Sequence, residues 1–302
     1  MQEDTIFYKY KTVSVDHLKE LQDDIDKLYC EDKLSHNEVY RSYIENKRFE
    51  IPENLPDAKS IIILAIFTKL ALVNFNFEGK KRQLMIPPQY YDDGLTLDDI
   101  KTLVKKNIIK QQGYKIEMSS SMHLKLLAVR SGLGKFGKNN LCYVDEMGSF
   151  ISLYAFFTDF EFKQDDWTDI SMMEQCSSCT ICMKSCPNGC IREDNFVIDA
   201  GRCLPLFNEI QGEFPDWLDK KAHNALIGCM RCQLPCPADH QVINQPVFLE
   251  DLTEQETNMI LNGKIERDLL DSICKKLKMF TPANSDSRIP VIQRNLKALI
   301  NS

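Results

Sequence analysis

The sequence predicts an α+β protein, and three observations along the chain support this fold class. Helical and strand patterns alternate up to about residue 170, the segment 171–245 is rich in cysteine with few strand signals, and the segment 246–302 looks helical. Alternating helices and strands are typical of a layered domain, whereas a cysteine-rich segment with few strands is expected where bound metal replaces a hydrophobic core. We therefore expect an N-terminal α/β domain over 1–170, a metal-binding domain over 171–245 and a short helical C-terminus over 246–302.

The apolar pattern places the elements of the first domain. Apolar residues recur at helical spacing from Val15 to Leu28, which predicts an amphipathic helix. The run SIIILAIF, Ser60–Phe67, is short, apolar and rich in β-branched residues, as a central strand buried on both faces should be. Further along we expect a polar loop over Arg82–Gly94, a helix capped by Thr96 that runs to about Gln111, strands over Tyr114–Met118 and Ser149–Phe157, and a helix over about Ser121–Arg130.

Composition and charge narrow the class of protein. The sequence begins without the basic and apolar regions of a secretory signal, and no apolar stretch approaches the ~20 residues that span a bilayer, so a cytoplasmic location is expected. The formal net charge is −7 and the pI is near 5.4, whereas a nucleic-acid binder needs a basic surface. Nucleic acid is therefore not the expected partner, although net charge does not describe how the charges are distributed.

The cysteines are concentrated in one segment. Nine of the twelve lie between residues 176 and 236, and in a cytosolic chain clustered thiols more often bind metal than form disulfides. The string CSSCTICMKSCP has the CxxCxxCxxxCP pattern of bacterial two-cluster ferredoxins. Structural zinc is the alternative for paired CxxC motifs, but a third cysteine at the same interval and a repeated Cys-Pro are not features of zinc sites.

We expect two 4Fe-4S clusters with crossed ligands. Three thiolates from one tight loop cap three irons of one cubane, while the cysteine before the proline reaches the other cubane. Cluster one is assigned to Cys176, Cys179, Cys182 and Cys236, and cluster two to Cys186, Cys203, Cys229 and Cys232. Cys190 is left over and is interpreted as a small packed residue.

Around these motifs the chain resembles the epoxyqueuosine reductases, a family related to the reductive dehalogenases. The resemblance is carried by AVRSGLGKFGKNNLCYVDEMGSFISLYAFFTD, by CSSCTICMKSCPNGCI, by VIDAGRC and by IGCMRCQLPCP. It implies a nitroreductase-like domain that binds cobalamin, joined to a bacterial ferredoxin-like domain that relays electrons through two 4Fe-4S clusters to the corrinoid cobalt. Nothing in composition or spacing indicates a corrinoid independently.

The glycine-rich loop after the helix that ends near Arg130 has two interpretations. The spacing GxGxxG alone is weak evidence for a dinucleotide site, because this loop closes a helix rather than opening one. A capped turn is one interpretation, and a backbone cradle for a phosphate or amide arm of the cofactor, which the resemblance favours, is the other. The residues expected to bind the cofactor are Arg130, Gly132, Gly134, Lys135, Gly137 and Lys138.

The sequence also departs from the family pattern at the proton donor. Where the family has Asp-Ser-x-Pro, this chain reads Met118-Ser119-Ser120-Ser121, and the family's Gly-Arg-Asp-Tyr-His segment falls on IPPQYYDD. A leaving oxygen must be protonated, so Tyr90, Tyr91 and Ser119 become the candidate catalytic donors.

These departures, the chain's shorter C-terminus and its acidic balance lead to an expectation about function. We expect a divergent, shortened relative that reduces a small molecule through a bound corrinoid, with a ferredoxin or flavodoxin as electron donor. An electron-transfer protein that activates another corrinoid protein is the alternative, and epoxyqueuosine reduction on tRNA is placed third, with tRNA an unlikely partner.

Overall fold

The computed structural model describes residues 6–119, 121–193 and 196–300. The chain forms two compact units that do not follow chain order, because each unit is assembled from separate segments. The first unit comprises Met1–Phe67, Gly94–Thr180 and Arg192–Ile198, and the second comprises Thr68–Asp93, Ile181–Ile191 and Asp199–Ser302. The predicted boundaries near residues 170 and 245 stay a prediction.

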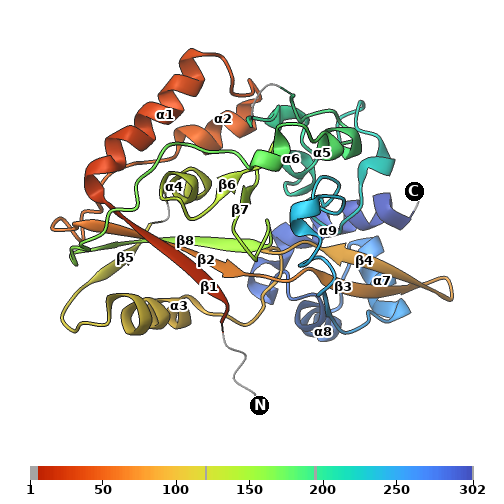
Figure 1. Ribbon diagram of the computed structural model, residues 1–302. Coiled ribbons are helices and arrows are strands. Elements are labelled where there is room, and N and C mark those ends of the chain that lie inside the picture. Colours follow the sequence, from red (N-terminus) through yellow and green to blue (C-terminus); the bar gives the residue numbers. More distant parts are fainter. Residues whose placement is uncertain (1–5, 120, 194–195, 301–302) are drawn as a thin grey trace. The chain divides into compact units, whose positions relative to one another are not determined.

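The first unit is built on a four-stranded antiparallel sheet. Its strands are β1 (Tyr8–Ser14), β2 (Ser60–Phe67), β8 (Ile151–Thr158) and β5 (Ile116–Met118), paired in that order. Helices α1 (Leu18–Cys30), α2 (Glu38–Glu45) and α4 (Leu124–Arg130) lie on one side of this sheet, and α3 (Leu97–Leu103) lies on the other (Figure 1).

The central strand was predicted from its sequence, and β2 spans the same residues, Ser60–Phe67. Because side chains alternate across a strand, Ile61 and Ile63 pack with α1 and α4 in one apolar core, while Ile62 and Leu64 pack with α3 in the other. All four are at most 1% exposed, which explains why this strand is apolar at every position although the sheet is antiparallel.

Most of the other predicted elements of the first unit are present, with shifted ends. Thr96 caps α3 and Asp99 returns the bond to the Thr96 backbone, which forms a capping box. The helix continues through a π-helical turn, η2 (Val104–Ile109), and ends at Lys110 in a left-handed conformation, one residue before the predicted end. Helix α4 begins at Leu124, three residues later than predicted.

The second unit contains a β-hairpin where the sequence analysis expected a loop. Strands β3 (Ala71–Phe77) and β4 (Lys80–Ile86) pair around Glu78 and Gly79, whose φ angles are 51° and 68°. Positive φ at both central residues is the signature of a two-residue hairpin turn that follows the strand twist. The loop predicted from Arg82 therefore begins only after Ile86.

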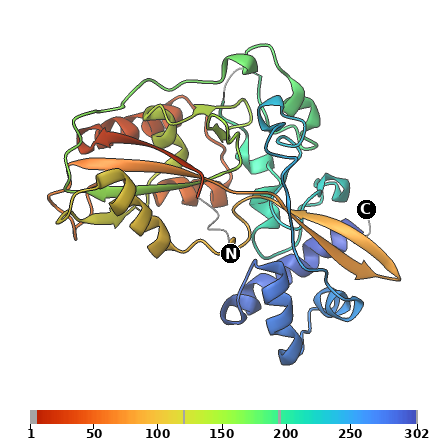
Figure 2. The same cartoon turned by 60° about the horizontal axis from the view of Figure 1, so that its bottom comes forward.

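The C-terminal helices complete the second unit. They are α7 (Glu254–Asn262), α8 (Arg267–Leu277) and α9 (Ser285–Ile300), as the helical pattern predicted. Strand β9 (Val247–Phe248) adds to β3 in parallel. The hairpin lies beside these helices (Figure 2), and together they form one apolar core that includes Phe75, Ile260 and Leu296.

The remaining elements are short. They are β6 (Lys135–Phe136), β7 (Cys142–Tyr143), α5 (Ile181–Ser185), α6 (Pro205–Asn208) and the 3-10 helices η1 (Val15–His17), η3 (Glu174–Cys176), η4 (Ala200–Arg202), η5 (Lys220–Ala222), η6 (Pro237–Asp239) and η7 (Pro282–Asn284). The fold is mixed α/β, in agreement with the predicted class, while the nitroreductase-like description stays a prediction. Within the described ranges, no helix has both the length and the apolar character that crossing a membrane requires.

Candidate redox site

Cysteine thiols of three separate segments gather in the second unit. The Sγ atoms of Cys186 and Cys190 are 3.3 Å apart, and the Cys190 thiol also hydrogen-bonds the side chain of Cys203. Cys229 lies near enough to interact electrostatically with both Cys186 and Cys190. The group therefore contains three of the four ligands assigned to cluster two, together with the cysteine that sequence reasoning had set aside.

The loop that carries Cys229 is held by two buried asparagines. The Asn208 side chain donates to the Gly228 carbonyl at 2.7 Å and accepts from the Gly228 N–H at 3.0 Å. Asn295 of α9 in turn donates to the carbonyls of Asn208 and Leu226, at 2.8 and 3.0 Å. Both asparagines are fully buried at 0% exposure. The C-terminal helix thus fixes the loop that carries Cys229, which the sequence analysis assigned to cluster two. Helical periodicity in the sequence gave no signal for this contact.

A backbone amide also points at the Cys229 sulfur. The Arg231 N–H lies 3.4 Å from Cys229 Sγ, and the Gln233 side chain donates to the Cys229 carbonyl at 3.3 Å. Hydrogen bonds to ligand sulfur are a principal means by which proteins set the reduction potential of an iron-sulfur cluster. The loop is therefore suited to hold a cluster ligand rather than an unliganded thiol.

The cysteines assigned to cluster one are divided between the two units. Cys176 ends the 3-10 helix η3, and Cys179 follows it in the first unit. Lys138, only 6% exposed, donates from Nζ to the Cys179 carbonyl at 3.2 Å. Cys182 lies on α5, and Cys236 directly precedes η6, both in the second unit.

The donor set fits iron-sulfur clusters by its chemistry. Thiolates are the ligands of 4Fe-4S cubanes, and each thiolate of a cubane binds a different iron. Among the residues that the structure describes, no three His, Cys, Asp or Glu side chains converge tightly enough to hold one metal ion. The partition of the eight ligands into two sets stays a prediction.

The two predicted donor tyrosines have hydroxyls that already bond to the chain. Tyr90 donates from its hydroxyl to Glu209, and its ring lies over Gly228, next to Cys229. Burial, followed by the neighbouring Glu209 carboxylate, raises the pKa of Tyr90 above its ordinary value. Tyr91 donates to the Lys69 carbonyl at 3.0 Å, and burial raises its pKa to about 12. Tyr90 is therefore a partly buried, protonated phenol beside the thiol group of the second unit.

Ser119, the third predicted donor, lies in the first unit. Its backbone N–H donates to the Ala155 carbonyl at 2.8 Å, directly after β5, whereas its buried Oγ makes no hydrogen bond with the described residues. Of the neighbouring serines, Ser120 lies outside the described residues. A buried hydroxyl without a partner is uncommon and calls for a bound water or ligand.

The glycine loop packs closely against its own hairpin. Gly132, with φ +68°, ends α4, which agrees with the interpretation as a capped turn. A Cβ atom on Gly134 would meet Cys142 Sγ at 2.6 Å, and one on Gly137 would meet the Tyr143 ring at 2.5 Å. The space over these glycines is filled by β7, whereas the side chain of Lys135 is exposed.

Arg130 is also held by the chain. Its guanidinium forms two bonds of 2.7 Å with Asp24 and stacks over Trp167. These contacts fix α4 against α1 and give Arg130 a structural role. A cofactor-binding role for Arg130 and the glycine loop stays a prediction.

A family model described as the 4Fe-4S double cluster binding domain matches residues 175–239. Curated relatives include the epoxyqueuosine reductase of Staphylococcus aureus, 26% identical over 80% of this chain, and that of Escherichia coli, 37% identical over 37% of this chain. The chain spans 65% of the first relative and 28% of the second. It is thus homologous to epoxyqueuosine reductases and contains a double-cluster segment.

Solved structures agree with this homology at the level of fold. A Bacillus subtilis epoxyqueuosine reductase, with its catalytic aspartate loop swung out of the active site, matches with a TM-score of 0.66 at 21% identity, over 97% of this chain and 77% of that one. An epoxyqueuosine reductase with a tRNA-Tyr epoxyqueuosine-modified stem loop matches with a TM-score of 0.64 at 20% identity, over 97% and 76%.

These findings correct two expectations. The ranking that placed a small-molecule corrinoid reductase first and epoxyqueuosine reduction last is wrong, because the curated relatives are epoxyqueuosine reductases. The expectation that tRNA is an unlikely partner is also wrong, since a homologous structure carries a tRNA stem loop. The physical reason is that a net charge of −7 sums over the whole chain and does not describe any one surface.

Proposed function

We propose that this protein reduces the epoxide of epoxyqueuosine in tRNA with electrons passed through two 4Fe-4S clusters. The observation that carries the proposal is the double-cluster match over residues 175–239 in a chain homologous to epoxyqueuosine reductases. The thiol group of the second unit supports it, because it brings together cysteines that lie far apart in the sequence.

The chemistry of the proposed reaction defines what the protein must supply. Removing an epoxide oxygen as water, with formation of a double bond, consumes two electrons and two protons. Two clusters that each carry one electron can store the electrons. The protons require a donor held near the leaving oxygen.

Three predicted donors remain for the proton. Tyr90 is protonated at neutral pH because a phenol has an ordinary pKa near ~10, which burial raises further. Ser119 holds a buried hydroxyl that bonds to no described residue. Tyr91 is the third, and its hydroxyl donates to the Lys69 carbonyl, as that of Tyr90 donates to Glu209. A phenol is a much stronger acid than an aliphatic hydroxyl, so we favour Tyr90.

The resemblance also implies a corrinoid, which when bound would hold two electrons at one metal for delivery to carbon. Cys142 and Tyr143 fill the space where a Cβ of Gly134 or Gly137 would lie, so these contacts give the predicted cradle no support. The exposed ammonium of Lys135 is open to an anionic group. A corrinoid is therefore proposed on the resemblance alone, and no step of the reaction is assigned to it.

The test is an anaerobic assay with epoxyqueuosine-containing tRNA and dithionite, run with and without added cobalamin. Queuosine is measured by mass spectrometry of the digested nucleosides. We expect product from the reconstituted protein, and at least about 100-fold less from Tyr90→Phe, given the usual worth of a general acid. Ser119→Ala is the matched variant and should retain activity. A fully clustered protein that forms no queuosine under either condition would contradict the proposal.

A further inference from the structure

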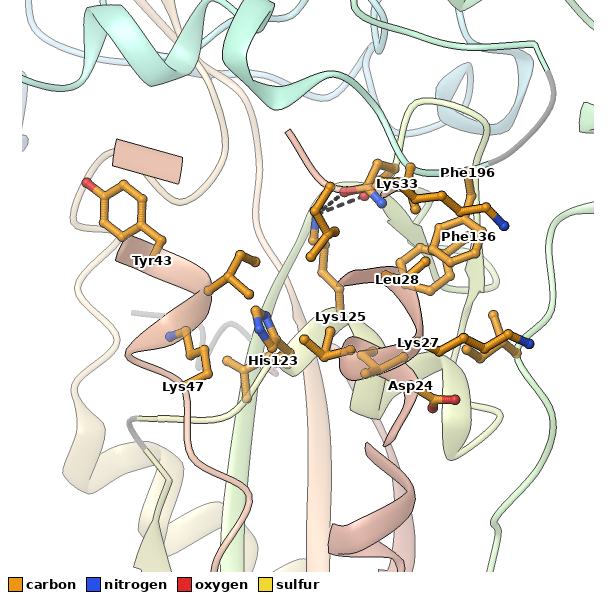
Figure 3. A pocket seen from close by; sticks show the side chains of 18 of the residues that line it. Asp24, Lys27, Leu28, Lys33, Tyr43, Lys47, His123, Lys125, Phe136 and Phe196 are labelled. Atoms are coloured by element: carbon orange, nitrogen blue, oxygen red, sulfur yellow. Dashed lines mark hydrogen bonds between the residues drawn. The ribbon is translucent and has the colours of Figure 1, made fainter. Parts of the chain in front are cut away.

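A large cavity lies within the first unit, formed by α1, α2 and the start of α4. It has a volume of about 710 Å³, within the range of sites that hold nucleotide-sized or drug-sized ligands. Figure 3 shows most of its lining side chains, which come from α1 and α2, from the start of α4, from Phe136 of β6 and from the segment around Phe196. Neither the cysteines nor the predicted proton donors line it.

The cavity has an excess of positive charge. Four lysines and two carboxylates line it, namely Lys27, Lys33, Lys47, Lys125, Asp24 and Glu31. Both carboxylates are already neutralised by the chain: Asp24 pairs with Arg130 at 2.7 Å, and Glu31 pairs with Lys33 at 2.6 Å. Lys47 makes no ion pair within the described residues. The Lys47 ammonium is therefore open to an anionic group of a ligand.

A histidine in the same wall has an unused hydrogen-bonding atom. His123 Nε2 is buried and bonds to no described residue, and its ring lies between Lys47 and Lys125 (Figure 3). Burial, and then these two ammonium groups, lower the pKa of His123 to about 4. The imidazole is thus neutral at physiological pH and adds no charge of its own to the wall.

The rest of the wall is apolar and includes aromatic rings. Phe136 and Phe196 stack with ring centroids 4.4 Å apart and an interplanar angle of 11°. Ile25, Leu28 and Met122 line the cavity between the helices. An inorganic anion would leave this apolar surface in contact with water, whereas an apolar ligand would leave Lys47 and His123 without a partner.

We propose that this cavity binds an organic anion with a flat apolar body, such as an aromatic phosphate of nucleotide size. The anionic group sits at the Lys47 ammonium, on the side of the cavity that also carries His123 and Lys125; the Lys125 Nζ already donates to the carbonyl and the side chain of Asn140 at 2.8 and 2.9 Å. The ring system lies against the apolar wall formed by Phe136 and its neighbours. This site is separate from the proposed electron-transfer function, because its lining contains none of the assigned cluster ligands.

Isothermal titration calorimetry of the anaerobic, cluster-loaded protein tests the proposal with three probes. They are 1-naphthyl phosphate, 1-naphthol, which has the same body without the charge, and inorganic phosphate, which has the charge without the body. We expect 1-naphthyl phosphate to bind with one site per chain and at least about tenfold more tightly than either fragment, since both halves contribute. Equal affinity for 1-naphthyl phosphate and 1-naphthol would overturn the anion site.

Variants locate the binding in this cavity. Lys47→Met should weaken 1-naphthyl phosphate about tenfold, the usual worth of a charge-assisted hydrogen bond, and leave 1-naphthol unchanged. Lys106→Met removes an exposed lysine outside the cavity and should change neither affinity. Leu28→Trp fills the cavity and should abolish binding of both organic probes. If the affinity for 1-naphthyl phosphate is the same in Lys47→Met and Leu28→Trp as in the unmodified chain, the proposed site is wrong.

Discussion

Asn208→Ala tests whether the buried amide contacts hold a cluster-two ligand in place. The substitution removes the side chain that bonds both the N–H and the carbonyl of Gly228, the residue before Cys229. It leaves intact the bond from the Asn295 side-chain amide to the Asn208 backbone carbonyl. The change is therefore confined to the contact between α6 and the ligand loop.

The magnitude follows from the burial of the groups left behind. Gly228 is buried, so its N–H and carbonyl would lose their partners and find no bulk water. An unsatisfied buried polar group costs about 1–3 kcal/mol, so the free energy of unfolding should fall by about 2–6 kcal/mol. This is a large part of the 5–15 kcal/mol that is typical of a folded protein.

The assay is urea unfolding of the anaerobic, cluster-loaded protein, followed by circular dichroism and by iron analysis. The urea midpoint should fall by about 1 M or more, and the spectrum of cluster two should weaken. Asn76→Ala is the matched control: its side chain donates to the Leu252 carbonyl at 2.6 Å, but that carbonyl also accepts from the Asn76 N–H. A midpoint for Asn208→Ala no lower than that of the control would refute the reasoning.

Three further predictions concern the residues around the clusters. Gly228→Ala should destabilise the protein by about 1–2 kcal/mol from its φ of +67° alone, and by more because the new Cβ meets the Tyr90 ring at 2.9 Å; thermal unfolding beside Gly79→Ala, which has φ +68° and open space, isolates the clash. Cys186→Ser should remove cluster two, assigned to Cys203, Cys229 and Cys232, and leave cluster one largely intact. Loss of cluster one instead, measured by electron paramagnetic resonance, would disprove the crossed assignment. Lys138→Met should make the potential of cluster one more negative, because a buried ammonium beside Cys179 stabilises the reduced form, and an unchanged potential in a redox titration would remove that role.

The sequence predicted the elements whose signal is local. Ser60–Phe67 is apolar at every position because both faces of β2 are covered, and this pattern could be recognised without knowing the partners. The Thr96 capping box is encoded by two residues three positions apart. The ferredoxin-like cysteine spacing is equally local, and the double-cluster match over 175–239 agrees with it.

The features that were missed depend on contacts between distant segments. The alternation of apolar and polar residues in Ala71–Ile86 and the Glu78-Gly79 turn could have revealed the hairpin. The polar residues of β4, however, are also typical of a loop. Cys190 is buried, as its interpretation as a packed residue expects, but its contact with Cys203, thirteen positions later, is not encoded by spacing alone. The expectation that tRNA is an unlikely partner was wrong for a related reason, because the total charge of the chain carries no information about where the charges lie.

A single-turnover experiment tests the central claim most directly. The cluster-loaded protein is reduced, freed of excess reductant and mixed anaerobically with epoxyqueuosine-containing tRNA, while cluster absorbance and queuosine are followed together. Because two clusters store two electrons and each epoxide consumes two, we expect up to one queuosine per chain, formed as the clusters reoxidise. Clusters that stay reduced in the presence of the tRNA, with no queuosine formed, would contradict the account.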